Sequence, residues 1–165
     1  MNTLTNDYRL AIDFNTVESV PEDPRKRLPY FHSFKELIQI EKVKIKDWHR
    51  SGAGGWEVIQ SQTSLIDEVV RHVLLSMAQL EQYKSKSVLE DFCLIAVGGY
   101  GRGELNPLSD IDLLFLLPTR PKLITGTFIQ DVLSVLWGFG MEIGHSSRTI
   151  KDCIKLANEE LTIKT

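Results

Sequence analysis

The sequence predicts an α+β protein in which a helical hairpin precedes a small sheet flanked by helices. Two observations support this prediction. Residues 34–80 carry apolar side chains at helical intervals, with a glycine-rich break between two stretches. From Phe92 onward, short apolar runs of strand length alternate with helical patterns. At 165 residues and 42% hydrophobic residues, the chain is long enough for one domain with a substantial core.

The charge and hydropathy of the chain argue against nucleic acid and membranes as partners. The formal net charge of -3 gives no basic footprint for a nucleic-acid backbone, so we expect no nucleic-acid substrate. The N-terminus lacks the basic start and apolar stretch of a signal peptide, and the longest apolar run, residues 113–117, cannot span a bilayer. We therefore expect a soluble, cytoplasmic protein that does not bind membranes.

The chain is expected to have three parts. Residues 1–32 should be extended or disordered, because the stretch VPEDPRKRLPY is rich in proline, and we assign them no catalytic role. Residues 33–84 should form the helical hairpin, and residues 85–165 the remaining core. The sequence ends inside a predicted helix, so we expect that core to be truncated at its C-terminus.

The hairpin is predicted from its caps and its apolar stripe. Ser33 and Glu36 have capping-box spacing, which predicts a helix from about residue 34 to residue 50. The glycine-rich residues 51–55 end that helix, and a second should begin near Trp56. Its apolar stripe is Val58, Ile59, Leu65, Ile66, Val69, Val70, Val73, Leu74, Met77 and Leu80. The hairpin should support the rest of the domain.

Three apolar runs predict strands. Residues 92–97 form a nearly continuous run that ends at a glycine pair, as a buried strand would, and residues 111–117 form a second that ends at Pro118. Residues 141–148 indicate a third, shorter strand. The pattern therefore predicts two successive strands, a helix and then a third strand.

Helices are predicted around the third strand. Residues 125–139 show helical spacing, and Thr149 with Asp152 has the spacing that begins a last helix. Cys93 falls in the first strand pattern and Cys153 in the last helix, and we expect both to be buried thiols with no part in chemistry.

A pair of aspartates is the strongest chemical signal. Asp110 and Asp112 are two residues apart at the start of the second strand, and alternate side chains of a strand share a face. Two carboxylates held this close repel each other, and a divalent cation removes the conflict. Magnesium binds through one or two protein carboxylates together with phosphate oxygens and water. We expect a magnesium site here, with Mn²⁺ as the alternative ion.

Glycines precede this pair. At Gly98 and Gly99 the lack of a side chain would allow backbone N–H groups to approach a triphosphate. Arg102 adds a positive charge nearby. A short helix after Gly99 would favour the same anion at its N-terminus. Ser109 could bind a phosphate oxygen or cap the turn before the strand.

The combination resembles a known signature. A strand, Gly-Gly, a short connection and Asp-x-Asp at the start of an apolar strand resemble the DNA polymerase beta-like nucleotidyltransferase superfamily. Within it, GGYGRGELNPLSDIDLL (98–114) and LWGFGMEIGHSSRT (136–149) are similar to the protein-PII uridylyltransferase family. The helical hairpin is more loosely similar to that family's N-terminal extension.

The resemblance implies a polymerase beta-like nucleotidyltransferase fold with a mixed sheet flanked by helices. It also implies UTP and Mg²⁺ as ligands, and transfer of UMP to a tyrosine hydroxyl of the PII nitrogen-signalling protein. Asp110 and Asp112 match the metal-binding catalytic carboxylates, and Gly98 and Gly99 the glycines of the nucleotide loop. Full-length family members also carry a His-Asp hydrolase domain and ACT domains, and no His-Asp dipeptide occurs in these 165 residues.

The third carboxylate of the superfamily pattern is the feature that this sequence does not clearly match. Many members have one on a later strand, and Glu142, the only acidic residue of the third strand, is the candidate for this catalytic carboxylate here. Glu142, Gly144 and Ser146 share one face and Ile143 and His145 the other, but which face meets the site is open.

Two further residues of this stretch carry side chains that can bind phosphate or transfer a proton. Arg148 is a phosphate-binding candidate, and His145 is either a site residue or a structural one. Three functions remain open: uridylylation of PII, transfer of another nucleotide or to another acceptor such as protein adenylylation, and nucleotide binding without catalysis.

Overall fold

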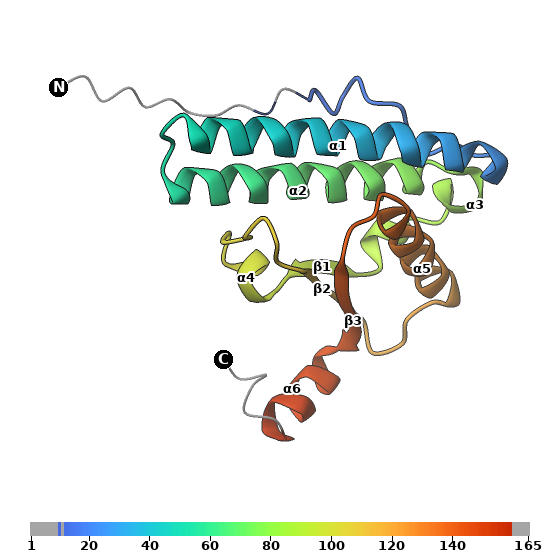
Figure 1. Ribbon diagram of the computed structural model, residues 1–165. Coiled ribbons are helices and arrows are strands. Elements are labelled where there is room, and N and C mark those ends of the chain that lie inside the picture. Colours follow the sequence, from blue (N-terminus) through green and yellow to red (C-terminus); the bar gives the residue numbers. More distant parts are fainter. Residues whose placement is uncertain (1–9, 11, 160–165) are drawn as a thin grey trace.

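The structure is a computed structural model, which describes residue 10 and residues 12–159. Two long helices, α1 (Arg27–Arg50) and α2 (Gly55–Ala78), run antiparallel and lie side by side over the rest of the domain (Figure 1). The 3-10 helix η1 (Pro24–Lys26) leads into α1. After α2 follow α3 (Glu81–Lys84), η2 (Val88–Glu90), β1 (Cys93–Ala96), α4 (Gly98–Gly101), β2 (Ile111–Leu117), α5 (Leu123–Gly138), β3 (Ile143–Thr149) and α6 (Ile150–Glu159).

The strands form one mixed sheet in the order β1-β2-β3. β1 pairs with β2 antiparallel, and β2 pairs with β3 parallel, so that Asp112 lies opposite Gly144. A parallel pair needs a long crossover, which α5 supplies. The α+β class with a small mixed sheet flanked by helices, consistent with a polymerase beta-like nucleotidyltransferase fold, is confirmed.

One core joins the helices to the sheet. Phe115 of β2 is fully buried, and Phe92 lies between it and Phe128 of α5, with ring centroids 5.7 Å and 6.1 Å apart. At the other end of α5, Phe139 stacks on Phe34 of α1 at 4.3 Å. The hairpin therefore packs as part of the same hydrophobic core as the sheet. The three-part division of the chain stays a prediction.

The predicted start of the first helix is wrong. Helix α1 begins at Arg27, and Ser33 lies inside it rather than capping it. The earlier start has a local cause in η1, which leads directly into α1: the Asp23 side chain caps η1 by accepting a hydrogen bond from the Arg25 N–H (3.0 Å), and Pro24 is the first residue of η1. Pro29 falls in the first turn of α1, where a missing N–H costs little. Residues 27–32, expected to be extended, are therefore helical.

The segment before α1 packs on the hairpin. Residues 12–26 contain turns and the short helix η1, yet the side chains of Phe14 and Val20 are buried. The Val20 N–H donates to Ser76 Oγ of α2, and His72 of α2 contacts the Glu18 carbonyl (3.1 Å). Residues 12–23 thus lack regular helix and strand, in keeping with the expectation of extended or disordered chain, but they pack on the hairpin; residues 1–9 and 11 lie outside the described part of the chain.

One face of the sheet carries apolar side chains that stay accessible. Cys93 and Ile95 of β1 are exposed, and Leu114 and Leu116 of β2 are half-buried on the same face. The helices of the described residues cover the opposite face and leave this one open. The predictions of a buried first strand and a buried Cys93 are therefore wrong. Cys153 is half-buried.

The remaining elements agree with the sequence pattern. The break at residues 51–55, helix α2, strand β2 and helix α5 are confirmed. Thr149 and Asp152 cap α6 as predicted, with Thr149 Oγ1 donating to Asp152 Oδ2 at 2.6 Å. These contacts lower the pKa of the Asp152 carboxyl. Among the described helices, none is both long and apolar enough to cross a membrane.

Candidate nucleotide site

A cleft of about 770 Å³ opens between the first turns of α2, α4 and the chain that leads into β2. We call residues 98–105 the glycine loop. The cleft is lined by Trp56, Ile59, Gly99, Arg102, Glu104, Asn106, Leu108, Ser109, Asp110 and Asp112. Of the candidate residues from the sequence, the structure therefore brings together Gly99, Arg102, Ser109, Asp110 and Asp112.

The Asp112 carboxylate is held in a space made by two glycines. A Cβ atom at Gly98 would lie 3.1 Å from Asp112 Oδ2, and a Cβ atom at Gly144 would overlap with Asp112 Oδ1. Gly98 begins α4, and Gly144 lies on β3 directly opposite Asp112 in the sheet. A side chain at either position would displace the carboxylate. Gly98 thus contributes to the site by making room for Asp112.

Both aspartates line the cleft. Asp110 precedes the first residue of β2 and is exposed, whereas Asp112 is half-buried within the strand. Within the described residues, no group of three or more His, Cys, Asp or Glu side chains is placed to hold a metal ion. A pair of carboxylates fits Mg²⁺, which completes its shell with phosphate oxygens and water. The residues present therefore suit a cation that binds together with a phosphate ligand.

The glycine loop owes its shape to close backbone contacts. Gly98 has a φ of +61°, which side-chain-bearing residues rarely adopt. A Cβ at Gly101 would lie 2.5 Å from the Ala96 carbonyl oxygen, so α4 can approach β1 only with glycine there. Helix α4 has only four residues. It is too short to contribute the anion-binding helix terminus that the sequence suggested.

Tyr100 anchors the loop to α2. Its side chain is buried, and its hydroxyl donates to Asp67 Oδ1 at 2.7 Å. Burial, followed by the hydrogen bond and charge of Asp67, raises the pKa of Tyr100 well above its ordinary value. The hydroxyl therefore remains a hydrogen-bond donor at physiological pH.

Arg102 and Ser109 lie at the polar side of the cleft. The Arg102 Nε–H donates to Glu104 Oε2 at 3.0 Å, and both side chains are largely exposed. An exposed pair of this kind contributes little stability, so the guanidinium can turn toward an anion. The Ser109 N–H donates to the Asn106 carbonyl (3.0 Å), which closes a turn before the aspartates.

Trp56 and Ile59 form an apolar wall that the sequence pattern did not identify. Trp56 lies in the first turn of α2 and is 59% exposed. Leu108, which also lines the cleft, is 98% exposed. Helical periodicity placed Ile59 in the core stripe, and it could not show that this end of the stripe faces a cleft. Exposed large apolar side chains around a polar cleft are typical of a binding site.

Glu142 lies in a neighbouring pocket. It is exposed, it precedes β3, and its carbonyl accepts a hydrogen bond from the Ile111 N–H at 3.0 Å. Its pocket, of about 220 Å³, includes Ser109 but neither aspartate. The structure therefore does not bring Glu142 among the residues that line the cleft, and its role as a third carboxylate stays a prediction.

The face of β3 that the sequence left open is settled by the register. Gly144 pairs with Asp112, and Arg148 pairs with Leu116, so Gly144, Ser146 and Arg148 share the face of Asp112. Arg148 is half-buried toward the far end of that face. His145 lies on the opposite face and packs its ring against Trp137 of α5 at 5.6 Å. The exposed His145 side chain therefore lies on the face of the sheet opposite Asp112.

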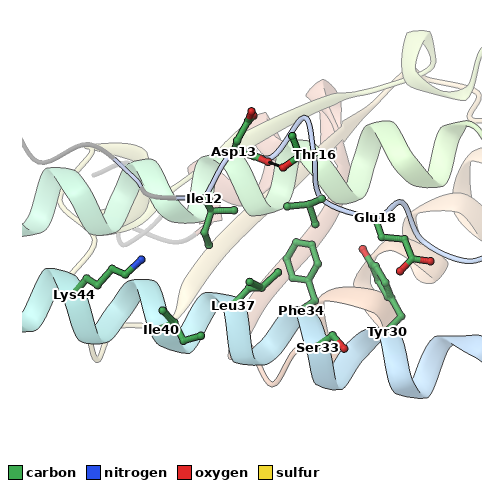
Figure 2. A pocket seen from close by; sticks show the side chains of 11 residues that line it. Ile12, Asp13, Thr16, Glu18, Tyr30, Ser33, Phe34, Leu37, Ile40 and Lys44 are labelled. Carbon is green, nitrogen blue, oxygen red and sulfur yellow. Dashed lines mark hydrogen bonds between the residues drawn. The ribbon is translucent and has the colours of Figure 1, made fainter.

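A second hollow lies away from the cleft, between the N-terminal segment and α1 (Figure 2). It has a volume of about 450 Å³, and Tyr30, Phe34, Leu37 and Ile40 of α1 are among the residues that line it. Figure 2 shows Asp13 at its edge, where the Asp13 carbonyl accepts a hydrogen bond from Thr16 Oγ1 (2.8 Å). None of the candidate site residues lines it.

Comparison with known proteins identifies the domain. Residues 77–157 match the nucleotidyltransferase domain family. The chain is 33% identical over 159 residues to the bifunctional uridylyltransferase/uridylyl-removing enzyme of Caulobacter vibrioides, which covers 95% of this chain and 17% of that protein. The enzyme of the same name from Phenylobacterium zucineum is 40% identical over the same shares. That from Photobacterium profundum is 32% identical, over 99% of this chain and 16% of the relative.

The similarity covers nearly all of this chain but only a small part of each relative. No solved structure matches the chain significantly. The cleft with its aspartate pair lies inside the matched domain, apart from the wall that α2 contributes. Residues 77–157 therefore form a domain that matches the nucleotidyltransferase family, and the chain is similar to the N-terminal region of bifunctional uridylyltransferase/uridylyl-removing enzymes.

Proposed function

We propose that this chain transfers UMP from UTP to a tyrosine hydroxyl of a PII signalling protein in the cytoplasm. The observation that carries the proposal is the cleft in which Asp110, Asp112 and Arg102 lie beside the glycine loop, within a nucleotidyltransferase domain. The relatives named above are uridylyltransferases, which supports UTP as the nucleotide. PII is the acceptor that the similarity of residues 98–114 and 136–149 implies.

Asp110 and Asp112 are the residues that would hold Mg²⁺. They line the cleft, and the glycines at 98 and 144 keep the Asp112 carboxylate at its place. When bound, Mg²⁺ would neutralise charge on the phosphates and on the leaving pyrophosphate. Manganese would suit the same oxygen ligands.

The other lining residues would bind and orient the nucleotide. Gly99 leaves room for a phosphate, and the exposed guanidinium of Arg102 supplies a positive charge beside it. Ser109 can donate its hydroxyl to a phosphate oxygen. Arg148 does not line the cleft, but it adds positive charge farther along the sheet face that carries Asp112. Trp56 and Ile59 offer an apolar wall on which a base can lie.

The transfer itself is an in-line displacement. The acceptor oxygen forms a bond to the α-phosphorus, the bond from that phosphorus to the bridging oxygen of the β-phosphate breaks, and pyrophosphate leaves. The hydroxyl proton passes to solvent water as the new bond forms, so that the transfer balances. Positioning and charge stabilisation by the cleft residues supply the rate enhancement.

The deciding experiment incubates the chain with labelled UTP, Mg²⁺ and a PII protein. Labelled PII and released pyrophosphate support the proposal, and the Asp112→Asn variant should give neither. Labelled ATP in place of UTP tests protein adenylylation with the same protein. Binding of UTP without labelling of PII would contradict the proposed transfer and leave a nucleotide-binding module.

A further inference from the structure

Three side chains of α2 contact the glycine loop. Gln60 Nε2 donates to the Gly103 carbonyl (2.7 Å), the Leu105 N–H donates to Thr63 Oγ1 (3.2 Å), and Asp67 accepts from Tyr100 (2.7 Å). These positions are three and four residues apart, so they lie on one face of the helix. Figure 1 shows α4 beneath the first half of α2, as these contacts require.

Thr63 makes two hydrogen bonds through its hydroxyl, one as donor and one as acceptor. Its hydroxyl donates to the Ile59 carbonyl at 2.9 Å, which leaves its lone pair for the Leu105 N–H. Thr63 and Leu105 are both buried, so neither group can find water if the other is removed. Ile59 itself lines the cleft, so this bond connects the loop to the cleft wall.

The loop needs such external support because it has little structure of its own. Helix α4 has four residues, and glycines with positive φ, Gly98 and Gly103, lie at both of its ends. The α2 contacts fix Tyr100, Gly103 and Leu105, which alternate with Gly99 and Arg102 along the chain. The residues that line the cleft are thus positioned by the hydrogen bonds that their neighbours in the loop make with α2.

We propose that Gln60, Thr63 and Asp67 are positioning residues that hold the glycine loop in its nucleotide-binding conformation. The inference rests on the proposed nucleotide site. By this inference the helical hairpin contributes positioning residues to the nucleotide site, in addition to supporting the fold. These three residues precede the segment 77–157 that matches the nucleotidyltransferase domain family.

The test compares matched substitutions by their affinity for Mg²⁺ with UTP, measured by calorimetry at a temperature where circular dichroism shows each protein folded. Thr63→Val keeps the side-chain shape and removes the hydroxyl, whereas Thr63→Ser retains it. Asp67→Leu removes the acceptor, whereas Asp67→Asn retains an acceptor oxygen. Glu68→Gln is the control, because Glu68 pairs with Arg71 on the surface of the same helix (2.6 Å).

We expect Thr63→Val and Asp67→Leu to weaken UTP binding about tenfold or more, as loss of a buried hydrogen bond does. Thr63→Ser, Asp67→Asn and Glu68→Gln should bind UTP within about twofold of the parent. Amide exchange of residues 98–105 should accelerate in Thr63→Val, while that of α5 stays unchanged. Tyr100→Phe, which removes only a hydroxyl, should give the same loss as Asp67→Leu, and their combination no further loss.

Parent-like UTP affinity in the folded Thr63→Val and Tyr100→Phe proteins would overturn the inference, even if both melt at lower temperature. That result would make the contacts purely structural while leaving the nucleotide site intact. Failure of the parent chain to bind UTP at all would instead contradict the proposed function, and this inference with it.

Discussion

Gly144 leaves the space that the Asp112 carboxylate occupies. The two residues lie opposite each other on the parallel strands β2 and β3, and a Cβ at Gly144 would overlap with Asp112 Oδ1. The position of the proposed metal-binding carboxylate therefore depends on a missing side chain on the neighbouring strand.

Gly144→Ala should abolish the gain in melting temperature that Mg²⁺ with UTP gives the parent. Ligand at a hundred times its dissociation constant stabilises by about 2.7 kcal/mol, which is roughly 5 to 10 °C for a domain of this size. Thermal denaturation with and without ligand measures the gain. Gly126→Ala is the control: Gly126 lies in α5 with open space around it, and alanine there should stabilise by about 0.5–1 kcal/mol without changing the gain. A full ligand-induced gain in Gly144→Ala would show that Asp112 is not constrained as described.

Asp112→Asn should leave the ligand-free protein equally or more heat-stable. Replacement of one carboxylate relieves repulsion from Asp110 in the shared cleft. A purely structural aspartate would instead cost roughly 0.5–2 kcal/mol on losing its hydrogen bonds. The gain from Mg²⁺ with UTP should largely vanish in the variant. A clearly destabilised variant that keeps the full gain would remove Asp112 from the metal site.

Gly99→Val and Gly101→Ala should separate ligand binding from folding. A Cβ at Gly99 meets Glu104 and Arg102 at 3.4 Å and 3.9 Å, which are ordinary contacts, so Gly99→Val should fold but bind UTP about tenfold or more weakly. Gly101→Ala forces a Cβ against the Ala96 backbone and should cost about 1–3 kcal/mol of stability. Denaturant unfolding and UTP titration measure the two effects. Unchanged UTP affinity in Gly99→Val would reduce Gly99 to a turn residue.

His72 should make stability depend on pH. His72 of α2 is partly buried by the N-terminal segment, and this burial lowers the pKa of its imidazole from 6.5, because desolvation disfavours the charged form. Hydrogen bonds to the Glu18 and Phe14 backbone raise the pKa in part, and the Arg71 charge lowers it further. The stability from neutral His72 is therefore fully present above pH 6.5 and is lost as the pH falls through the lowered pKa. His72→Phe, which keeps a ring beside Phe14 and Phe34, should lose less stability than the parent between pH 7 and pH 5. Identical pH profiles in denaturant titrations would contradict this assignment.

Short-range patterns account for most of the secondary structure. The apolar run of residues 111–117, which ends at Pro118, predicted strand β2, and the spacing of Thr149 and Asp152 predicted the start of α6. These features depend on residues within one turn or one strand, which the local sequence contains. The start of α1 was missed although Asp23 and Pro24 carried a local signal, because the capping spacing at Ser33 competed with it.

The sequence by itself determined the helical hairpin and the strands, and it singled out the carboxylates and glycines from which a metal and phosphate site is proposed. Only the tertiary structure decided that Gly144 lies beside Asp112, that His145 packs on Trp137, and that Thr63 holds the glycine loop. Each of these contacts joins residues more than seven positions apart in the chain, on different elements. Register and helix rotation set such contacts, and these follow from burying one common core rather than from any local pattern.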